Sequence, residues 1–494
     1  MRFTSRFSRR KFLQQTASTA AALSTIPVLS ATGVASAQTS PDGPLKSIPI
    51  THTLAKWVVQ SHMSDIPDSV RKEAVRSIVN SVGATVGGSA DETVTTAMRV
   101  LRPYSGPPKA SLFGRADRLD PLNAALVNGI SSHVLDYDDT ELNTIIHPAG
   151  VVASALFALA ADHPVSGTEF LHAFILGTEI ECRLGDAIYP SHYDLGWHIT
   201  ATCGVFGAAA ACGKLLGLDE QKMVWALSTA AVQASGLKVV FGSMGKSFQV
   251  GRAAENGLLS ALLAQEGFTG SNMPLEGVGG YLGAASRHYD ATRLIDHLGD
   301  HYEITSNTYK PFPCGIVIHP AIDAAIQMKK QFHLRPEEMT YIAIRANPLM
   351  LQLTGKQTPR TGLEGKFSAY HSVAIALIRG QVGLAEYTDA SVRNSEVVAL
   401  RSKVHITTDP SIRSDEVYMS ITTADGHVYE KHVEHAIGSL QRPMTDTDLE
   451  VKFLGLAHPV LPEQQAKSLL AMCWKVESLA NVVEIPKAGA LRHA

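Results

Sequence analysis

The sequence of 494 residues has few of the features that metal-binding or disulfide-stabilised proteins need. It contains five cysteines, an odd number, and no C-x-x-C pair occurs among them. Neither a zinc site nor a disulfide framework is therefore suggested, and we expect buried free thiols. The P-loop motif, a G-x-G-x-x-G after a strand and the H-E-x-x-H motif are also missing, so three common cofactor- or metal-binding signatures are excluded.

Aromatic residues are also scarce, at 6%, and charged residues make up only 18% of the chain. Hydrophobic residues account for 45%, and alanine and glycine are abundant. This composition is typical of a soluble globular protein. Small side chains favour closely packed helices over a β-sandwich, and the length suggests two or three folding units.

The N-terminus carries an export signal. A twin-arginine motif at 8–13 (SRRKFL) precedes a short apolar stretch at 17–34 and an A-x-A site at 35–37. We expect cleavage after Ala37, a periplasmic or exported protein, the twin-arginine export machinery as a partner, and no stable membrane anchor. Cleavage would remove five basic residues and no acidic one, lowering the net charge from −3 to −8 and arguing against nucleic acid as a partner.

The remaining chain predicts a mainly α fold in which a large all-helical domain contains an inserted, smaller α+β lid domain. Residues 38–50, rich in proline, read as a linker, and helical periodicity dominates residues 51–300. Residues 301–434 form the predicted lid, with a strand at 341–345 and a hairpin at 417–433 that turns at Asp425-Gly426. Residues 435–494 predict helices that rejoin the first domain.

One segment places a histidine at the start of an almost uncharged helix. His198 directly precedes residues 199–213, which are apolar on every side and therefore predict a buried helix. A histidine entering the interior there is a candidate acid or base in a closed pocket. A core histidine satisfied by hydrogen bonds fits this segment equally well.

A second segment, HVLDYDDT at 133–140, contains three carboxylates in four positions and is followed by His147-Pro148. Such carboxylates repel one another unless they face different partners or one stays protonated. Asp138-Asp139 alone is typical of a solvated helix end. An aspartate beside a histidine and an apolar helix is more suggestive of a site.

Three further loops contain cations or aromatic residues. The glycine-flanked loop at 242–246 brings Lys246 to a helix that contains Arg252, a plausible carboxylate site or a plain turn. Lys310 stands in a loop stiffened by Pro311 and Pro313 at the expected domain boundary, where pockets form. Tyr370 and His371 precede an apolar helix, with core packing as the alternative.

Together these segments resemble the MmgE/PrpD family, which includes dehydratases, decarboxylases and epimerases of small acids. The matching segments, in family order over roughly residues 50–460, are HVLDYDDT with HP, GTEIECRLG, GWHITATCGVFGAAAACGKLLGLD, QASGL, GSMGKSFQVGRAAENGLLSALLAQEGFTG, LEG, KPFPCG with HPAIDA, and GKFSAYHSVAIAL. The resemblance implies a homodimer and a site between the two domains with no metal and no organic cofactor. It places the family's site positions on Asp136, Thr140, His147, His198, Lys246 and Lys310.

The sequence departs from the family pattern in three places. The decarboxylases resemble one another in having a histidine five residues after the boundary lysine, where this chain has Gly315. The spacing from Thr140 to the His-Pro step is one residue longer than in the decarboxylases, and many members have tyrosine at the position of His371. Decarboxylation is therefore disfavoured as the reaction.

The resulting hypothesis is a cofactor-independent hydro-lyase for a small di- or tricarboxylate, similar to 2-methylcitrate dehydratase. Lys246 and Lys310 bind carboxylates, His198 removes a proton α to a carboxylate, and His147, oriented by Asp136, protonates the departing hydroxyl. Further substrate contacts are expected from these residues: Thr140, Arg252, Tyr370 and His371. An epimerase, isomerase or decarboxylase of a similar acid, and a non-catalytic periplasmic carboxylate-binding protein, are the alternatives.

Overall fold

The computed structural model describes residues 49–491. The expected leader at 1–37 and residues 38–48 of the expected linker lie outside the described residues. The linker was expected to reach residue 50, but Ile50 already opens the first described helix. In the described part of the chain, no helix combines the length and apolarity needed to cross a bilayer.

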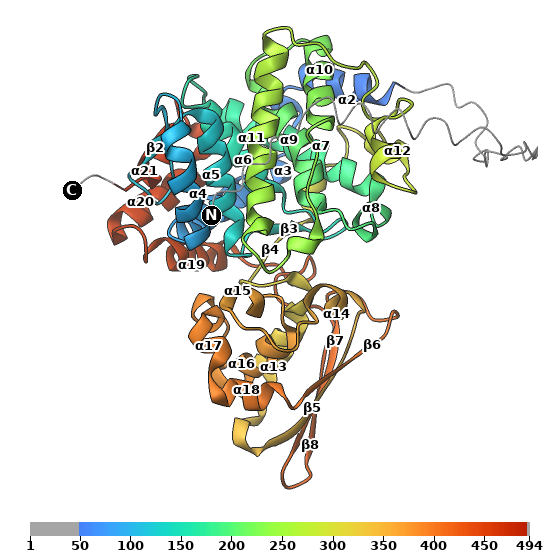
Figure 1. The fold of residues 1–494 in the computed structure, drawn as a ribbon, viewed down its shortest axis with the longest axis vertical. Coiled ribbons are helices and arrows are strands. Elements are labelled where there is room, and N and C mark those ends of the chain that lie inside the picture. Colours follow the sequence, from blue (N-terminus) through green and yellow to red (C-terminus); the bar gives the residue numbers. More distant parts are fainter. Residues whose placement is uncertain (1–48, 492–494) are drawn as a thin grey trace, which may run out of the picture. The chain divides into compact units, whose positions relative to one another are not determined.

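The first half of the described chain is helical, as its periodicity predicts (Figure 1). Asp120, Ser166 and Asp219 cap three of these helices through their side-chain oxygens, which accept backbone N–H groups that lack a partner within the helix. The helices are α2 (Ile50–Gln60), α3 (Asp68–Gly88), α4 (Glu92–Leu101), α5 (Pro121–Val134), α6 (Pro148–Leu159), α7 (Gly167–Ile188), α8 (Ser191–Asp194), α9 (Ile199–Leu215), α10 (Glu220–Ala231), α11 (Gly245–Gln265) and α12 (Tyr281–Ala285).

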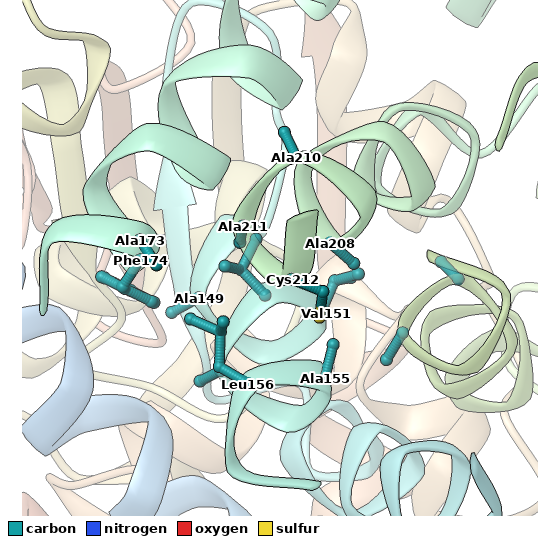
Figure 2. Close-up of a cluster of buried hydrophobic side chains, with 14 of the residues drawn as sticks. Ala149, Val151, Ala155, Leu156, Ala173, Phe174, Ala208, Ala210, Ala211 and Cys212 are labelled. Atoms are coloured by element: carbon teal, nitrogen blue, oxygen red, sulfur yellow. The ribbon is translucent and has the colours of Figure 1, made fainter. Parts of the chain in front are cut away.

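Small side chains allow the central helices α6, α7 and α9 to approach closely. Figure 2 shows Ala149 and Leu156 of α6 together with Phe174 of α7 and alanines of α9 in one apolar cluster. A Cβ atom added at Gly177 of α7 would lie 2.7 Å from the Gly207 carbonyl oxygen of α9. The backbones therefore pack at a distance that only glycine permits.

A second hydrophobic core is formed by residues between 312 and 433. Its sheet has the strand order β6-β5-β7-β8, in which β5 and β6 are parallel and the other neighbours antiparallel. Helix α13 contacts β7 and β8, and α16 contacts α13 and β6, so both cover the sheet (Figure 1). The elements are α13 (His319–Phe332), α14 (Leu349–Thr354), α15 (Gly362–Gly365), α16 (Ala369–Arg379), α17 (Asp389–Arg393), α18 (Ser395–Arg401), β5 (Met339–Ala346), β6 (Val404–Thr408), β7 (Val417–Thr423) and β8 (Val428–Val433).

The C-terminal helices return to the first core. They are α19 (Asp446–Ala457), α20 (Glu463–Trp474) and α21 (Glu484–Gly489), drawn in red in Figure 1. Both α19 and α20 contact α3, and residues 453–485 share one hydrophobic cluster with residues 50–304. The chain thus contributes first to the first core, then to the second core, and finally to the first core again.

Two short strands bring distant parts of the chain together next to the loop that bears Lys310. β3 (Asp139–Glu141) pairs antiparallel with β4 (Asn307–Tyr309), while β1 (Ala110–Ser111) pairs with β2 (Arg118–Leu119). The β3–β4 pair places the acidic segment beside the start of the Lys310 loop. The predicted mainly α fold is confirmed, with sheets that are few and small.

Candidate active site

The three carboxylates of the acidic segment have separate partners, because the chain turns sharply where α5 ends. Asp136 lies in the left-handed region, with φ of 53°, and Asp139 begins β3. Asp136 contacts two lysines, and Asp138 Oδ2 lies 2.5 Å from His133 Nδ1. Asp139 Oδ2 accepts hydrogen bonds from Ser77 and Asn307 instead. The expected repulsion among these groups is relieved by this separation.

These partners also give the three carboxyl groups different pKa values. Burial raises the pKa of a carboxyl group, but Lys246 and Lys310 hold the pKa of Asp136 well below its usual range. The nearby imidazoles His133 and His147 lower the pKa of Asp138 against its burial. Burial and the charge of Asp138 raise the pKa of Asp139 to about 6, against the hydrogen bonds from Asn307 and Ser77. The site therefore holds two firmly ionised carboxylates and one that binds protons readily.

Two ammonium groups from distant elements converge on Asp136. Lys310 Nζ donates to Asp136 Oδ1 at 2.6 Å, and Lys246 Nζ lies 3.0 Å from the same oxygen. Lys246 stands in the first turn of α11, which begins at Gly245. Its Nζ lies 5.0 Å from the ring centroid of Phe367, an aromatic face that attracts cations. The cavity wall is therefore positively charged on one side.

A second set of hydrogen bonds fixes the backbone of the Lys310 loop. Lys452 of α19 donates from Nζ to the Lys310 carbonyl oxygen at 2.9 Å, and the Tyr137 hydroxyl donates to the Pro311 carbonyl at 2.8 Å. Lys366 Nζ donates to the Leu135 carbonyl at 2.6 Å and so holds the acidic segment in the same way. Burial lowers the pKa of Lys452 to about 7 and that of Lys366 to about 8.

Three buried imidazoles lie side by side next to these charges. The ring centroid of His133 is 5.0 Å from that of His147 and 5.8 Å from that of His198. His147 and His198 directly precede α6 and α9. Burial lowers the pKa of His147 to about 3 and holds that of His198 well below its usual value. Both rings are therefore neutral at pH 7.

The sequence suggested that Asp136 orients the ring of His147, but the structure gives this ring other partners. Its Nδ1 lies 2.6 Å from the Asp139 carbonyl oxygen, 3.1 Å from Thr140 Oγ1 and 3.7 Å from Asp138 Oδ1. A carbonyl oxygen only accepts hydrogen bonds, so Nδ1 carries the proton and Nε2 keeps its lone pair. His147 is thus built as a proton acceptor, whereas the sequence suggested an acid.

A cavity of about 40 Å³ adjoins these groups. Mostly apolar and aromatic residues form the rest of its wall. The charged and imidazole residues that line it are Asp136, His147, His198, Lys246 and Lys310, and the other lining residues are Ile145, Tyr193, Phe241, Gly315, Ile316, Val317, Leu353, Thr354 and Phe367. A larger hollow of about 540 Å³ next to Asp186 and Arg293 contains none of the expected site residues.

The structure does not bring all the expected substrate contacts to this cavity. Thr140 is buried behind it, against His147. Arg252 has a side chain that is 42% exposed and pairs with Glu255. His371 is fully buried and its Nε2 donates to the Glu386 carbonyl, while the Tyr370 hydroxyl accepts from Gln357 at 3.4 Å. Arg252, Tyr370 and His371 are therefore not cavity residues, and the core-packing alternative describes His371.

Four residues at the site were not singled out from the sequence. His133 and Asp138 stand in the HVLDYDDT motif, and Lys366 stands in GKFSAYH, so their motifs were visible without their roles. Lys452 lies in an amphipathic helix about 140 residues from the loop that it supports, and no sequence signal indicated that contact.

The ligand atoms of Asp136, Asp138 and His147 lie within 4.8 Å of one another, a spacing that suits a metal ion. Lys310 Nζ, however, is 2.6 Å from Asp136 Oδ1 and 3.6 Å from Asp138 Oδ1, and Lys246 pairs with Asp136 as well. Two ammonium groups repel a divalent cation at this position. The donor set therefore fits lysine ammonium groups better than a metal.

Two family models and several known proteins match this chain. The MmgE/PrpD N-terminal domain matches residues 52–294, and the MmgE/PrpD C-terminal domain matches residues 312–476. The chain is 27% identical to cis-aconitate decarboxylase of Mus musculus over 88% of this chain and 92% of that protein. Cis-aconitate decarboxylase of Aspergillus terreus is 26% identical over 88% and 95%. The 2-methylcitrate dehydratase of Escherichia coli is 25% identical over 67% and 73%.

Proposed function

The chain belongs to the MmgE/PrpD family, and we propose that it is a cofactor-independent lyase for a small di- or tricarboxylate. In this proposal it removes a proton α to a carboxylate and expels water. The observation that carries the proposal is the convergence of Lys246 and Lys310 on Asp136, beside two neutral imidazoles in one small cavity.

Each group in the cavity supports one part of this reaction. A substrate carboxylate is attracted to Lys246 and Lys310, whose charges also stabilise the negative charge that develops as the α proton leaves. His147 Nε2 accepts that proton because Nδ1 is held by the Asp139 carbonyl. An anionic substrate beside the ring raises the pKa of His147 from its low value of about 3.

His147 alone carries out both proton transfers of the elimination. The C–H electron pair forms the carbon–carbon double bond as the C–O bond breaks, and the departing hydroxyl takes its pair with it. The imidazolium of His147 then returns the proton to that hydroxyl, so water leaves and the ring is neutral again. An epimerase shares the first step and differs only in returning the proton to the opposite face of the carbon.

Decarboxylation is the second candidate, favoured by the similarity to cis-aconitate decarboxylases over 88% of the chain. The local geometry favours the dehydratase. The position at which the decarboxylases resemble one another in having histidine is Gly315, which lines the cavity. A Cβ atom added there would lie 2.8 Å from Thr354 Cγ2, so a side chain is not accommodated without movement.

The test is an assay of purified protein with 2-methylcitrate, citrate, malate, tartrate isomers and cis-aconitate. Ultraviolet absorbance follows a new alkene, carbon dioxide release follows decarboxylation, and polarimetry follows inversion. We expect an alkene from one hydroxy acid, lost in Lys310→Met and kept in the exposed control Lys330→Met. Carbon dioxide release alone would replace the dehydratase with a decarboxylase. Thermal stabilisation by an acid without turnover would make the chain a carboxylate-binding protein.

Homodimer formation and twin-arginine export are part of the same proposal. Light scattering on the purified chain measures the first, and fractionation of cells that express the full sequence measures the second. We expect a dimer, and a processed form outside the cytoplasm.

A further inference from the structure

Gln249 contacts both a backbone segment and His198. It lies on α11, three residues after Lys246. Its Oε1 accepts a hydrogen bond from the Leu237 N–H, and its Nε2 lies 3.3 Å from the Leu237 carbonyl oxygen. A backbone N–H only donates and a carbonyl only accepts, so this pair of contacts fixes which end of the amide is the oxygen.

The other contact of the fixed amide is to the imidazole. Gln249 Nε2 lies 3.3 Å from His198 Nδ1. An amide nitrogen donates, so His198 Nδ1 is the acceptor and has no proton of its own. A neutral imidazole has one N–H, which must then be at Nε2. The His198 backbone N–H also donates to the Gly236 carbonyl at 3.0 Å, so the ring and residues 236–237 are tied together.

We infer that Gln249 is a positioning residue that holds His198 as a hydrogen-bond donor toward the substrate, and not as the base. This inference rests on the proposed function. His198 Nε2 makes no hydrogen bond within the described residues, and the ring lines the cavity. Its N–H donates to the carboxylate oxygen on which charge develops as His147 removes the α proton. The ring transfers no proton, so it needs no unstable imidazolate.

The two cavity imidazoles are thus fixed in opposite tautomers by neighbours of opposite kind. A carbonyl oxygen holds His147 with its lone pair at Nε2, and an amide N–H holds His198 with its proton at Nε2. This assignment reverses the roles suggested by the sequence. The charged or titratable groups around His198 are His133 of α5, His147 before α6, Lys246 of α11 and Asp138 of the acidic segment.

The test compares Gln249→Glu with Gln249→Met, which has similar length and cannot hydrogen-bond. Gln249 is only half-buried, so a glutamate there ionises. Its carboxylate accepts from His198 Nδ1, which moves the proton of the neutral ring to Nδ1 and raises the His198 pKa. We expect Gln249→Glu to gain a descending limb of kcat with rising pH between about pH 6 and 9, because the donor at Nε2 is then lost. Gln249→Met should lose less than about tenfold in kcat without that limb.

A second measurement needs no substrate. Nitrogen NMR of histidine-labelled protein, with the His198 signals assigned by their loss in His198→Asn, reports the tautomer directly. In the wild type we expect His198 in the Nε2–H tautomer alone. In Gln249→Glu we expect an Nδ1–H ring or a charged ring. An Nδ1–H ring in the wild type, or superimposable pH profiles for the two variants, overturns the inference. An Nε2–H ring in a protein that turns over no acid refutes the proposed function and leaves the tautomer assignment standing.

Discussion

The sharpest prediction concerns Lys310→Met, which keeps the length of the side chain and removes its charge. The Lys310 side chain is 1% exposed, and its Nζ lies 2.6 Å from Asp136 Oδ1. In the proposed reaction this ammonium group stabilises developing negative charge. Removal of one such preorganised donor costs about 10²- to 10³-fold in kcat. We expect a loss of at least about 100-fold with any acid that the wild type converts.

The same substitution should lower stability, because Asp136 is buried and loses one of two cations. Breaking a buried ion pair from one side costs about 3–5 kcal/mol. Lys246 remains 3.0 Å from the carboxylate, so we expect the lower end, about 3 kcal/mol. In the double variant Lys310→Met/Asp136→Asn the uncompensated carboxylate is absent. Most of the lost stability should therefore return, while activity stays lost.

Urea unfolding of the wild type, both single variants and the double variant measures the coupling between the two residues. Steady-state kinetics on the same preparations measures turnover. Wild-type kcat in Lys310→Met would refute the role given to the ammonium group. A double variant less stable than both single variants would refute the electrostatic explanation of the stability loss.

Three further outcomes follow from the geometry. Glu181 is buried with both carboxyl oxygens unpartnered among the described residues, and burial raises its pKa well above the usual value. The free energy of unfolding should therefore fall as pH rises above about 4.3. Glu181→Gln should reduce that fall, as measured by urea midpoints from pH 5 to 8. Arg252→Ala should change kcat/KM less than twofold, because Arg252 pairs with Glu255 at the surface, and a tenfold loss would return it to the site. Gly315→Ala should lower stability by about 1–3 kcal/mol through its contact with Thr354, and Thr354→Ser should restore most of it in thermal unfolding; no rescue would mean a different cause.

Local chemistry made much of the fold predictable. Asp120-Pro121 and Asp219 are helix starts that depend on neighbouring residues alone. The apolar run after His198 forms a buried helix for the same reason. Residues 242–246 were assigned to a loop because glycines are typical of loops, whereas α11 already begins at Gly245.

The site was less predictable, because its contacts join residues far apart in the chain. The sequence singled out Asp136, Lys246 and Lys310 without indicating that both cations meet one carboxylate oxygen. Arg252 follows Lys246 by six residues, about 240° around the helix, and therefore faces elsewhere. The tautomers of the histidines depend on a carbonyl and an amide group that no motif reveals.

The contact between Lys452 and the Lys310 carbonyl has a consequence for biosynthesis. The loop that bears Lys310 is synthesised more than a hundred residues before α19, so until then the contact from Lys452 is missing and Tyr137 holds the loop without it. A chain that stops between Phe367 and Lys452 contains every cavity-lining residue but lacks this contact to the Lys310 loop. The complete support of that loop therefore forms only once α19 has been made.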